Sequence, residues 1–143
     1  MKDFLEQEII FAVKKLLKEN VNELLKNSQY VIPLIEFGGS ECGVVICPVI
    51  TMAGCEQTEK ERIIRQDTYS LTIIFKIPES SESELHCYAY SGAVSRVIYE
   101  NPTLLGQVDG AVITGKKYQS PKKPHCGEGW ELTLTLRMTV EGC

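Results

Sequence analysis

The sequence lacks any long apolar run and any strong excess of one charge. Its longest uncharged stretch, residues 42–55, contains Gly43, Pro48 and Gly54 and is shorter than the roughly 20 residues that cross a bilayer as a helix. The N-terminus alternates charged and apolar residues, whereas a signal peptide needs an uninterrupted apolar segment. The 143 residues carry 15 Lys plus Arg against 19 Asp plus Glu, a net charge of −4. This removes the electrostatic argument for a dedicated nucleic-acid binder. We expect a soluble protein made inside the cell, with no membrane partner.

Motifs of catalysis are also missing. The only two histidines, His86 and His125, leave few candidates for a general base. The sequence has no Gly-rich phosphate loop with Lys and Ser/Thr, no dinucleotide fingerprint after a strand, and no Gly-x-Ser-x-Gly nucleophile elbow. We therefore expect no enzyme activity, no catalytic residue and no cofactor.

Cysteine is the one residue type whose number stands out, yet the close Cys-x-x-Cys pairs of structural zinc sites are absent. The closest local pair is His125 with Cys126, and adjacent side chains rarely bind the same tetrahedral ion. His86 directly precedes Cys87, but neighbouring residues on a helix point in different directions. We expect reduced thiols that pack, and no metal site. The sequence has six cysteines: Cys42, Cys47, Cys55, Cys87, Cys126 and Cys143.

The remaining composition is that of an ordinary globular domain, with 43% hydrophobic and 24% charged residues. The length predicts a single domain over residues 1–143. From Leu5 to Leu25, apolar residues recur at three- and four-residue steps and predict an amphipathic helix that ends at Asn27-Ser28. Asp3 and Glu6 have the spacing of a capping box at its start.

Alternation and turn residues predict the other elements. A second helix should begin with a capping box of Ser81 and Glu84 and end at Asn101-Pro102. Its buried face should carry Leu85, Ala89, Ala93 and Val97. Strands are expected at residues 30–37, 43–50, 62–77, 111–117 and 131–140, with exposed loops at residues 51–60 and 118–129. Short connections favour antiparallel pairing. The predicted fold is a two-layer α+β domain, with a mixed or mostly antiparallel sheet and both helices on one face.

Two surfaces suggest binding. Lys116, Lys117, Lys122 and Lys123 lie within eight residues, with His125 beyond. This local positive patch could face nucleic acid or an acidic protein, or be only a solvated loop. The polar face of the last strand is rich in threonine, which suits a solvated sheet or a subunit contact. Pairing between subunits would also satisfy an exposed sheet edge.

The sequence resembles the tail terminator (tail completion, minor tail) proteins of long-tailed bacteriophages and prophages. Residues 101–108, Asn-Pro-Thr-Leu-Leu-Gly-Gln-Val, are similar to a segment that the family has after its second helix. Gly129-Trp130-Glu131 before the last strand and the order of elements also match. The sequence departs from the family at Leu105, where glycine is frequent, and in its cysteine content.

The resemblance implies a structural subunit that forms a ring, typically a hexamer. The ring would cap the tail tube, end its polymerisation and help join the tail to the head. Its partners would be copies of itself, the tail tube protein and head–tail connector proteins, with at most transient contact with DNA in the ring lumen. It would act in the host cytoplasm during assembly and then in the virion tail.

On this interpretation the loops at residues 51–60 and 116–127 meet neighbouring subunits or the tube. The candidate interface residues are Glu56, Lys60, Lys116, Lys117, Lys122, Lys123 and His125. Two alternatives remain open: another neck or head–tail connector protein, and a small ligand-, zinc- or thiol-dependent α+β domain.

Overall fold

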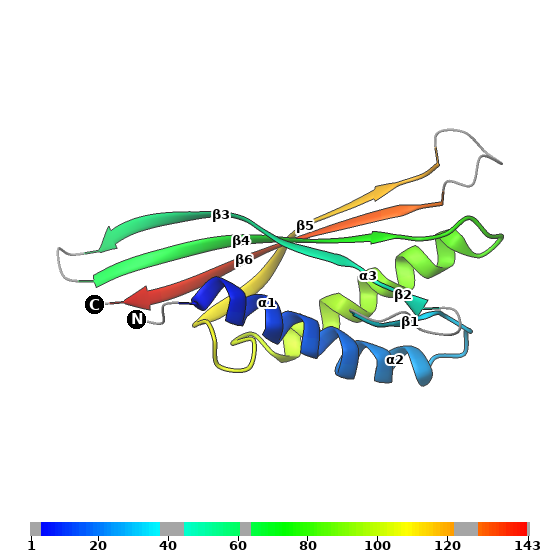
Figure 1. The fold of residues 1–143 in the computed structure, drawn as a ribbon, viewed down its shortest axis with the longest axis horizontal. Helices are drawn as coiled ribbons and strands as arrows, with labels where there is room; N and C mark the ends of the chain where they lie inside the picture. The colour runs from blue at the N-terminus through cyan, green and yellow to red at the C-terminus, as the bar shows by residue number, and fades with distance from the viewer. Residues whose placement is uncertain (1–3, 38–44, 61–63, 122–128, 143) are drawn as a thin grey trace.

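The computed structural model describes residues 4–37, 45–60, 64–121 and 129–142. The chain forms an N-terminal helical segment, a four-stranded antiparallel sheet and one further helix, which confirms the predicted α+β fold (Figure 1). In chain order the elements are α1 (Leu5–Leu16), η1 (Leu17–Val21), α2 (Asn22–Lys26), β1 (Leu34–Ile35), β2 (Val45–Ile46), β3 (Val49–Lys60), β4 (Ile64–Lys76), α3 (Ser83–Glu100), β5 (Gly110–Gln119) and β6 (Glu131–Gly142).

The N-terminal helix runs through α1, η1 and α2 without a break, because the residues at both junctions keep right-handed helical dihedrals. Its middle section, η1, is a turn of π-helix. Ile9, Val13, Leu17 and Val21 lie one above another at four-residue steps and are completely buried. The predicted helix is therefore confirmed. Its predicted cap Asp3 lies outside the described residues, and no side chain caps the helix at Phe4.

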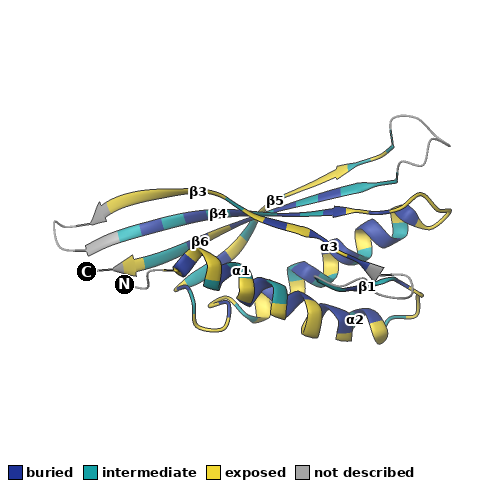
Figure 2. Cartoon of the chain, in the orientation of Figure 1, coloured by how far each residue is buried: buried dark blue, intermediate teal, exposed yellow. Residues whose placement is uncertain are grey.

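The main sheet has the strand order β3-β4-β6-β5, and every neighbouring pair is antiparallel. One face carries the core, in which alternate residues of the two central strands are completely buried. These residues are Leu71, Ile73 and Phe75 in β4, and Leu132, Leu134 and Leu136 in β6. The helices lie together on this side, as predicted (Figures 1 and 2). We call the other side the open face; Ser70, Thr72, Thr133 and Thr135 on it are half-buried.

The prediction of an exposed loop over residues 51–60 is wrong. These residues belong to β3, which pairs with β4 as far as Lys60, with one irregularity between Met52 and Gly54. All side chains from Ala53 to Thr58 are exposed, so this part of the strand shows no apolar alternation (Figure 2). Backbone hydrogen bonds to β4 hold it extended, and these leave no pattern in the side chains.

The predicted strand at residues 30–37 is reduced to Leu34–Ile35 in the structure. Of the predicted strand at residues 43–50, residues 43 and 44 lie outside the described residues, Val45–Ile46 form β2, and Val49 and Ile50 begin β3. Only Leu34–Ile35 and Val45–Ile46 pair with each other, in parallel, although we expected short connections to give antiparallel pairs. The Asn22 side chain forms two hydrogen bonds with the backbone of Ile35. Its Nδ2 donates to the Ile35 carbonyl at 2.8 Å, and its Oδ1 accepts from the Ile35 N–H at 2.7 Å. Pro48, which has no N–H to donate, separates β2 from β3.

The second helix ends at Asn101 as predicted, but its start and its buried face differ from the prediction. It begins at Ser83 after Glu82, with no side-chain cap, so the capping box of Ser81 and Glu84 is wrong. Ser83 instead closes the preceding turn, because its hydroxyl donates to the Pro78 carbonyl and accepts from the Ser80 N–H, each at 2.7 Å. The face toward the core contains His86, Cys87, Tyr90, Val94, Val97 and Ile98, whereas Leu85, Ala89 and Ala93 are only half-buried.

Candidate functional site

The two segments predicted to form an interface lie at opposite ends of the sheet. Through the strand register, Glu56 of β3 is level with Gly110, the first residue of β5. Lys116 is level with Ile50, six positions away along the strands. At about 3.3 Å per residue this separation is roughly 20 Å. Figure 1 shows the β3–β4 hairpin and the β5–β6 hairpin pointing in opposite directions. The two segments therefore do not form one continuous surface on a single chain.

The two described lysines of the expected positive patch face opposite sides of the sheet. Lys116 pairs with Leu134, which is buried under the helices, whereas Lys117 pairs with Thr133 of the open face. Both lysine side chains are exposed. Lys60 is the last residue of β3. Lys122, Lys123 and His125 lie outside the described residues. Successive strand residues alternate between faces, so Lys116 and Lys117 do not share a face of the sheet. The positive patch as a whole stays a prediction.

An aromatic cluster beside Lys116 joins α3 to the ends of β5 and β6. The Tyr118 hydroxyl is 2.7 Å from the Ser91 hydroxyl of α3. The Tyr88 ring meets Tyr118 edge-on, with ring centroids 5.4 Å apart, and meets Trp130 in the same way at 6.0 Å. Such edge-to-face pairs add to the energy of burial. The Glu84 carboxylate, which accepts a hydrogen bond from the Tyr88 hydroxyl, raises the pKa of Tyr88.

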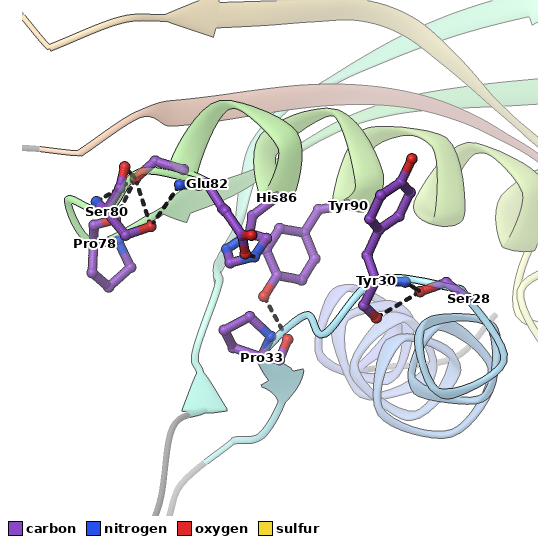
Figure 3. Close-up of polar contacts among 9 residues, drawn as sticks. Ser28, Tyr30, Pro33, Pro78, Ser80, Glu82, His86 and Tyr90 are labelled. Atoms are coloured by element: carbon purple, nitrogen blue, oxygen red, sulfur yellow. Dashed lines mark hydrogen bonds and ion pairs between the residues drawn. The ribbon is translucent and has the colours of Figure 1, made fainter.

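A buried polar group links α3 to the chain just before β1. The Tyr90 hydroxyl donates to the carbonyl of Pro33 (Figure 3). Its ring stacks on Phe75 with centroids 4.9 Å apart. Burial raises the pKa of Tyr90 far above its usual value. His86 lies beside it, and its Nε2 is 3.7 Å from Glu82 Oε2, with no hydrogen-bond partner among the described residues.

The geometry around Cys87 is unfavourable for thiol chemistry. Burial raises the pKa of the Cys87 thiol to about 11, so the thiol stays protonated at neutral pH. Cys47 and Cys55 are exposed, while Cys42, Cys126 and Cys143 lie outside the described residues. Within the described ranges, no group of three or more His, Cys, Asp or Glu residues could hold a metal ion.

The segment that carries the family resemblance forms a tight turn after α3. Three consecutive residues have positive φ angles: Leu104 at 49°, Leu105 at 59° and Gly106 at 84°. The Thr103 carbonyl accepts hydrogen bonds from the N–H groups of Gln107 at 2.9 Å and Val108 at 3.1 Å. Left-handed dihedrals favour glycine. Leu105 therefore adopts a backbone conformation that is costly for a residue with a Cβ atom.

Geometry also explains why the residue before Trp130 is a glycine. A Cβ atom on Gly129 would lie 1.5 Å from the carbonyl oxygen of Ile77, which excludes every other residue type without a backbone shift. Trp130 then accepts a backbone hydrogen bond from the Ile77 N–H at 2.8 Å. The close passage of the two chain segments aligns β6 with the end of β4.

Comparison of the chain with models of known protein families and with curated proteins found no match. Of the helices that the structure describes, none is both long and apolar enough to cross a membrane.

Proposed function

We propose that this protein is a structural subunit of a phage or prophage tail, which assembles as a ring that caps the tail tube, ends tube polymerisation and helps join the tail to the head. The subunit makes and breaks no covalent bond. It acts through surfaces that fit its own copies and the end of the tube. Its partners would be the tail tube protein and the head–tail connector proteins.

The observation that carries the proposal is the turn at residues 101–108. Its sequence is similar to the family segment, and its left-handed backbone at Leu105 supplies a reason for the glycine that the family often has at this position. The buried Leu104 side chain anchors the turn in the core, between the end of α3 and the start of β5. A sequence motif and a backbone requirement thus coincide at the same residues.

The sheet edges give further support. Among the described residues, β3 and β5 each pair with a strand on one side only, so the sheet ends in two unlike edges. Head-to-tail contacts between unlike surfaces close into rings when the rotation allows it. The ends of β3 and β5 that were expected to meet neighbours lie far apart, as a ring subunit with two neighbours requires.

The test is electron microscopy of tail tubes polymerised with and without the full-length protein. We expect the protein to sit at tube ends and to limit tube length. Tubes of unchanged length, with the protein absent from their ends, would contradict the proposal. A protein that binds the head portal but leaves tubes uncapped would instead be another neck or connector protein.

Contact with DNA in the ring lumen is a separate part of the proposal. Replacing Lys116, Lys122 and Lys123 together with Glu, with Lys117 kept, should impair head joining or DNA passage if these residues line the lumen. Unchanged tail assembly and head joining would remove the lumen role while leaving the capping role in place.

A further inference from the structure

Both edges of the main sheet are accessible along a regular stretch of strand. Beyond its irregularity at Met52 and Gly54, β3 is regularly paired on its inner side from Cys55 onward. Beyond its own irregularity at Ile113 and Gly115, β5 is regular from Lys116 to Gln119. Side chains at residues 55–58 and 116–118 are exposed on both faces. Among the described residues, β3 and β5 each pair with another strand on one side only, so the outer edge of each stretch faces no strand of the same sheet.

The strand directions allow the sheet to continue from one copy into the next. Every neighbouring pair in the order β3-β4-β6-β5 is antiparallel, so β3 and β5 run in opposite directions. A second copy placed beside β5 in the same orientation would present its own β3 antiparallel to β5. The joint would then have the same hydrogen-bond pattern as the rest of the sheet.

The charges on the two edges are complementary and select a register. Between Gly110 and Gln119, β5 has two lysines and no acidic residue, whereas Glu56 is the charged residue within residues 49–58 of β3. Glu56 pairs with Thr68 and Lys117 pairs with Thr133, which places both charges on the open face. Directly opposed residues of an antiparallel pair share a face. Glu56 can therefore oppose Lys117 while the helices of both copies stay on the same side.

We propose that copies of this chain join edge to edge, with residues 55–58 of β3 antiparallel to β5 of the next copy and Glu56 opposite Lys117. This inference rests on the proposed function, since it describes the contact that would build the ring. Lysines on an edge discourage pairing between two β5 edges, because like charges repel. The contact therefore favours unlike edges and repeats head to tail.

A charge exchange tests the contact in the full-length chain. We expect Glu56→Lys and Lys117→Glu each to raise the concentration at half-assembly about tenfold, and the double variant to return it to within about threefold of the original. Lys116→Glu is the matched control, because it makes the same charge change one residue away on the opposite face. Its effect should be less than threefold. Light scattering across protein concentration, with and without tail tubes, gives the measurement.

Disulfide trapping tests the register directly. In a chain with Cys47→Ser and Cys55→Ser, we expect Glu56→Cys combined with Lys117→Cys to form a ladder of oxidised oligomers. Opposed Cβ atoms of an antiparallel pair are close enough to cross-link. Glu56→Cys combined with Lys116→Cys should give few oxidised oligomers, because those two side chains point to opposite faces of the sheet.

The outcomes separate this inference from the proposed function. The protein could cap tubes while the double charge variant fails to restore assembly, or while cysteines at positions 116 and 117 cross-link equally well to position 56. Either result would overturn the edge contact and leave the capping function in place. Oligomers that show the rescue and the selective trapping but do not cap tubes would support the edge contact and contradict the proposed function. A chain that stays monomeric at every concentration and on tubes overturns the edge contact.

Discussion

Leu104 and Leu105 are consecutive residues with left-handed backbone dihedrals, yet one is completely buried and the other is 49% exposed. The turn directs Leu104 into the core between α3 and β5, and it leaves Leu105 at the surface. The two residues therefore contribute to the free energy of unfolding with opposite signs. Leu104 stabilises the fold through burial, whereas Leu105 retains a backbone strain that its exposed side chain offsets only in part.

Leu105→Gly should stabilise the protein by about 0.5–1 kcal/mol. A left-handed residue with a Cβ atom costs about 1–2 kcal/mol, and the larger freedom of glycine in the unfolded chain offsets part of the relief. Urea unfolding of both proteins measures the difference. Leu104→Ala is the paired variant and should destabilise by about 2–5 kcal/mol, since it leaves a cavity in the core. A loss of stability in Leu105→Gly would contradict the strain at this position.

Gly129→Ala should destabilise the protein strongly, because the added methyl group would overlap the Ile77 carbonyl oxygen. The backbone at the start of β6 would have to move, and we expect a loss of more than about 2 kcal/mol. Gly92→Ala is the control. Its Cβ meets no atom within 4 Å in the exposed middle of α3, so it should stabilise by about 0.5–1 kcal/mol. Thermal unfolding of the two variants should therefore shift in opposite directions.

Tyr90→Phe should cost about 1–3 kcal/mol, because it leaves the partly buried Pro33 carbonyl without its hydrogen-bond donor. The phenyl ring can still stack on Phe75, so the packing is retained. Tyr88→Phe removes a hydroxyl that bonds the Glu84 carboxylate at the surface, and its effect should be within about 0.5 kcal/mol. Urea unfolding measures the loss of stability in both variants. Equal losses would argue against a stabilising hydrogen bond between Tyr90 of α3 and the segment before β1.

Stability should decrease as the pH rises above about 9. Burial raises the pKa of Cys87 to about 11, and burial together with the neighbouring Cys55, Glu6 and Asp67 raises the pKa of Tyr69 to about 12. The unfolded chain loses these protons first, so it binds fewer protons than the folded chain in this pH range. The free energy of unfolding therefore falls until the folded-state pKa values are passed.

Urea unfolding at pH 8, 9 and 10 measures this dependence. In Cys87→Ala the decline above pH 9 should be shallower than in the original protein, because one of the titrating groups is removed. A thiol reagent at pH 8 gives an independent check, since exposed Cys47 should react while Cys87 should not react until the protein unfolds. Rapid reaction of Cys87 in the folded protein would contradict its protonated, buried state.

The separation of the predicted interface residues shows where sequence reasoning stops. Lys116 and Lys117 are neighbours in sequence, but the pleat of β5 sends them to opposite faces. The predicted strand over residues 111–117 contains both lysines, so its pleat already predicts that they face opposite sides. Only the tertiary structure decides which of the two faces the helices cover. The aromatic contact among Tyr88, Tyr118 and Trp130 joins three elements, and no local pattern relates these residues before the sheet is assembled.

By itself, the sequence determined the elements whose apolar residues repeat with a single period. The helix from Leu5 and the strands β4 and β6 each bury one face. Their apolar residues therefore recur with the 3.6-residue period of a helix or the 2-residue period of a strand. Only the tertiary structure decided that residues 51–60 form a strand, because their order comes from hydrogen bonds to β4 and not from buried side chains. It also decided that β3 and β5 are the two edges, since strand order depends on contacts between segments far apart in the chain.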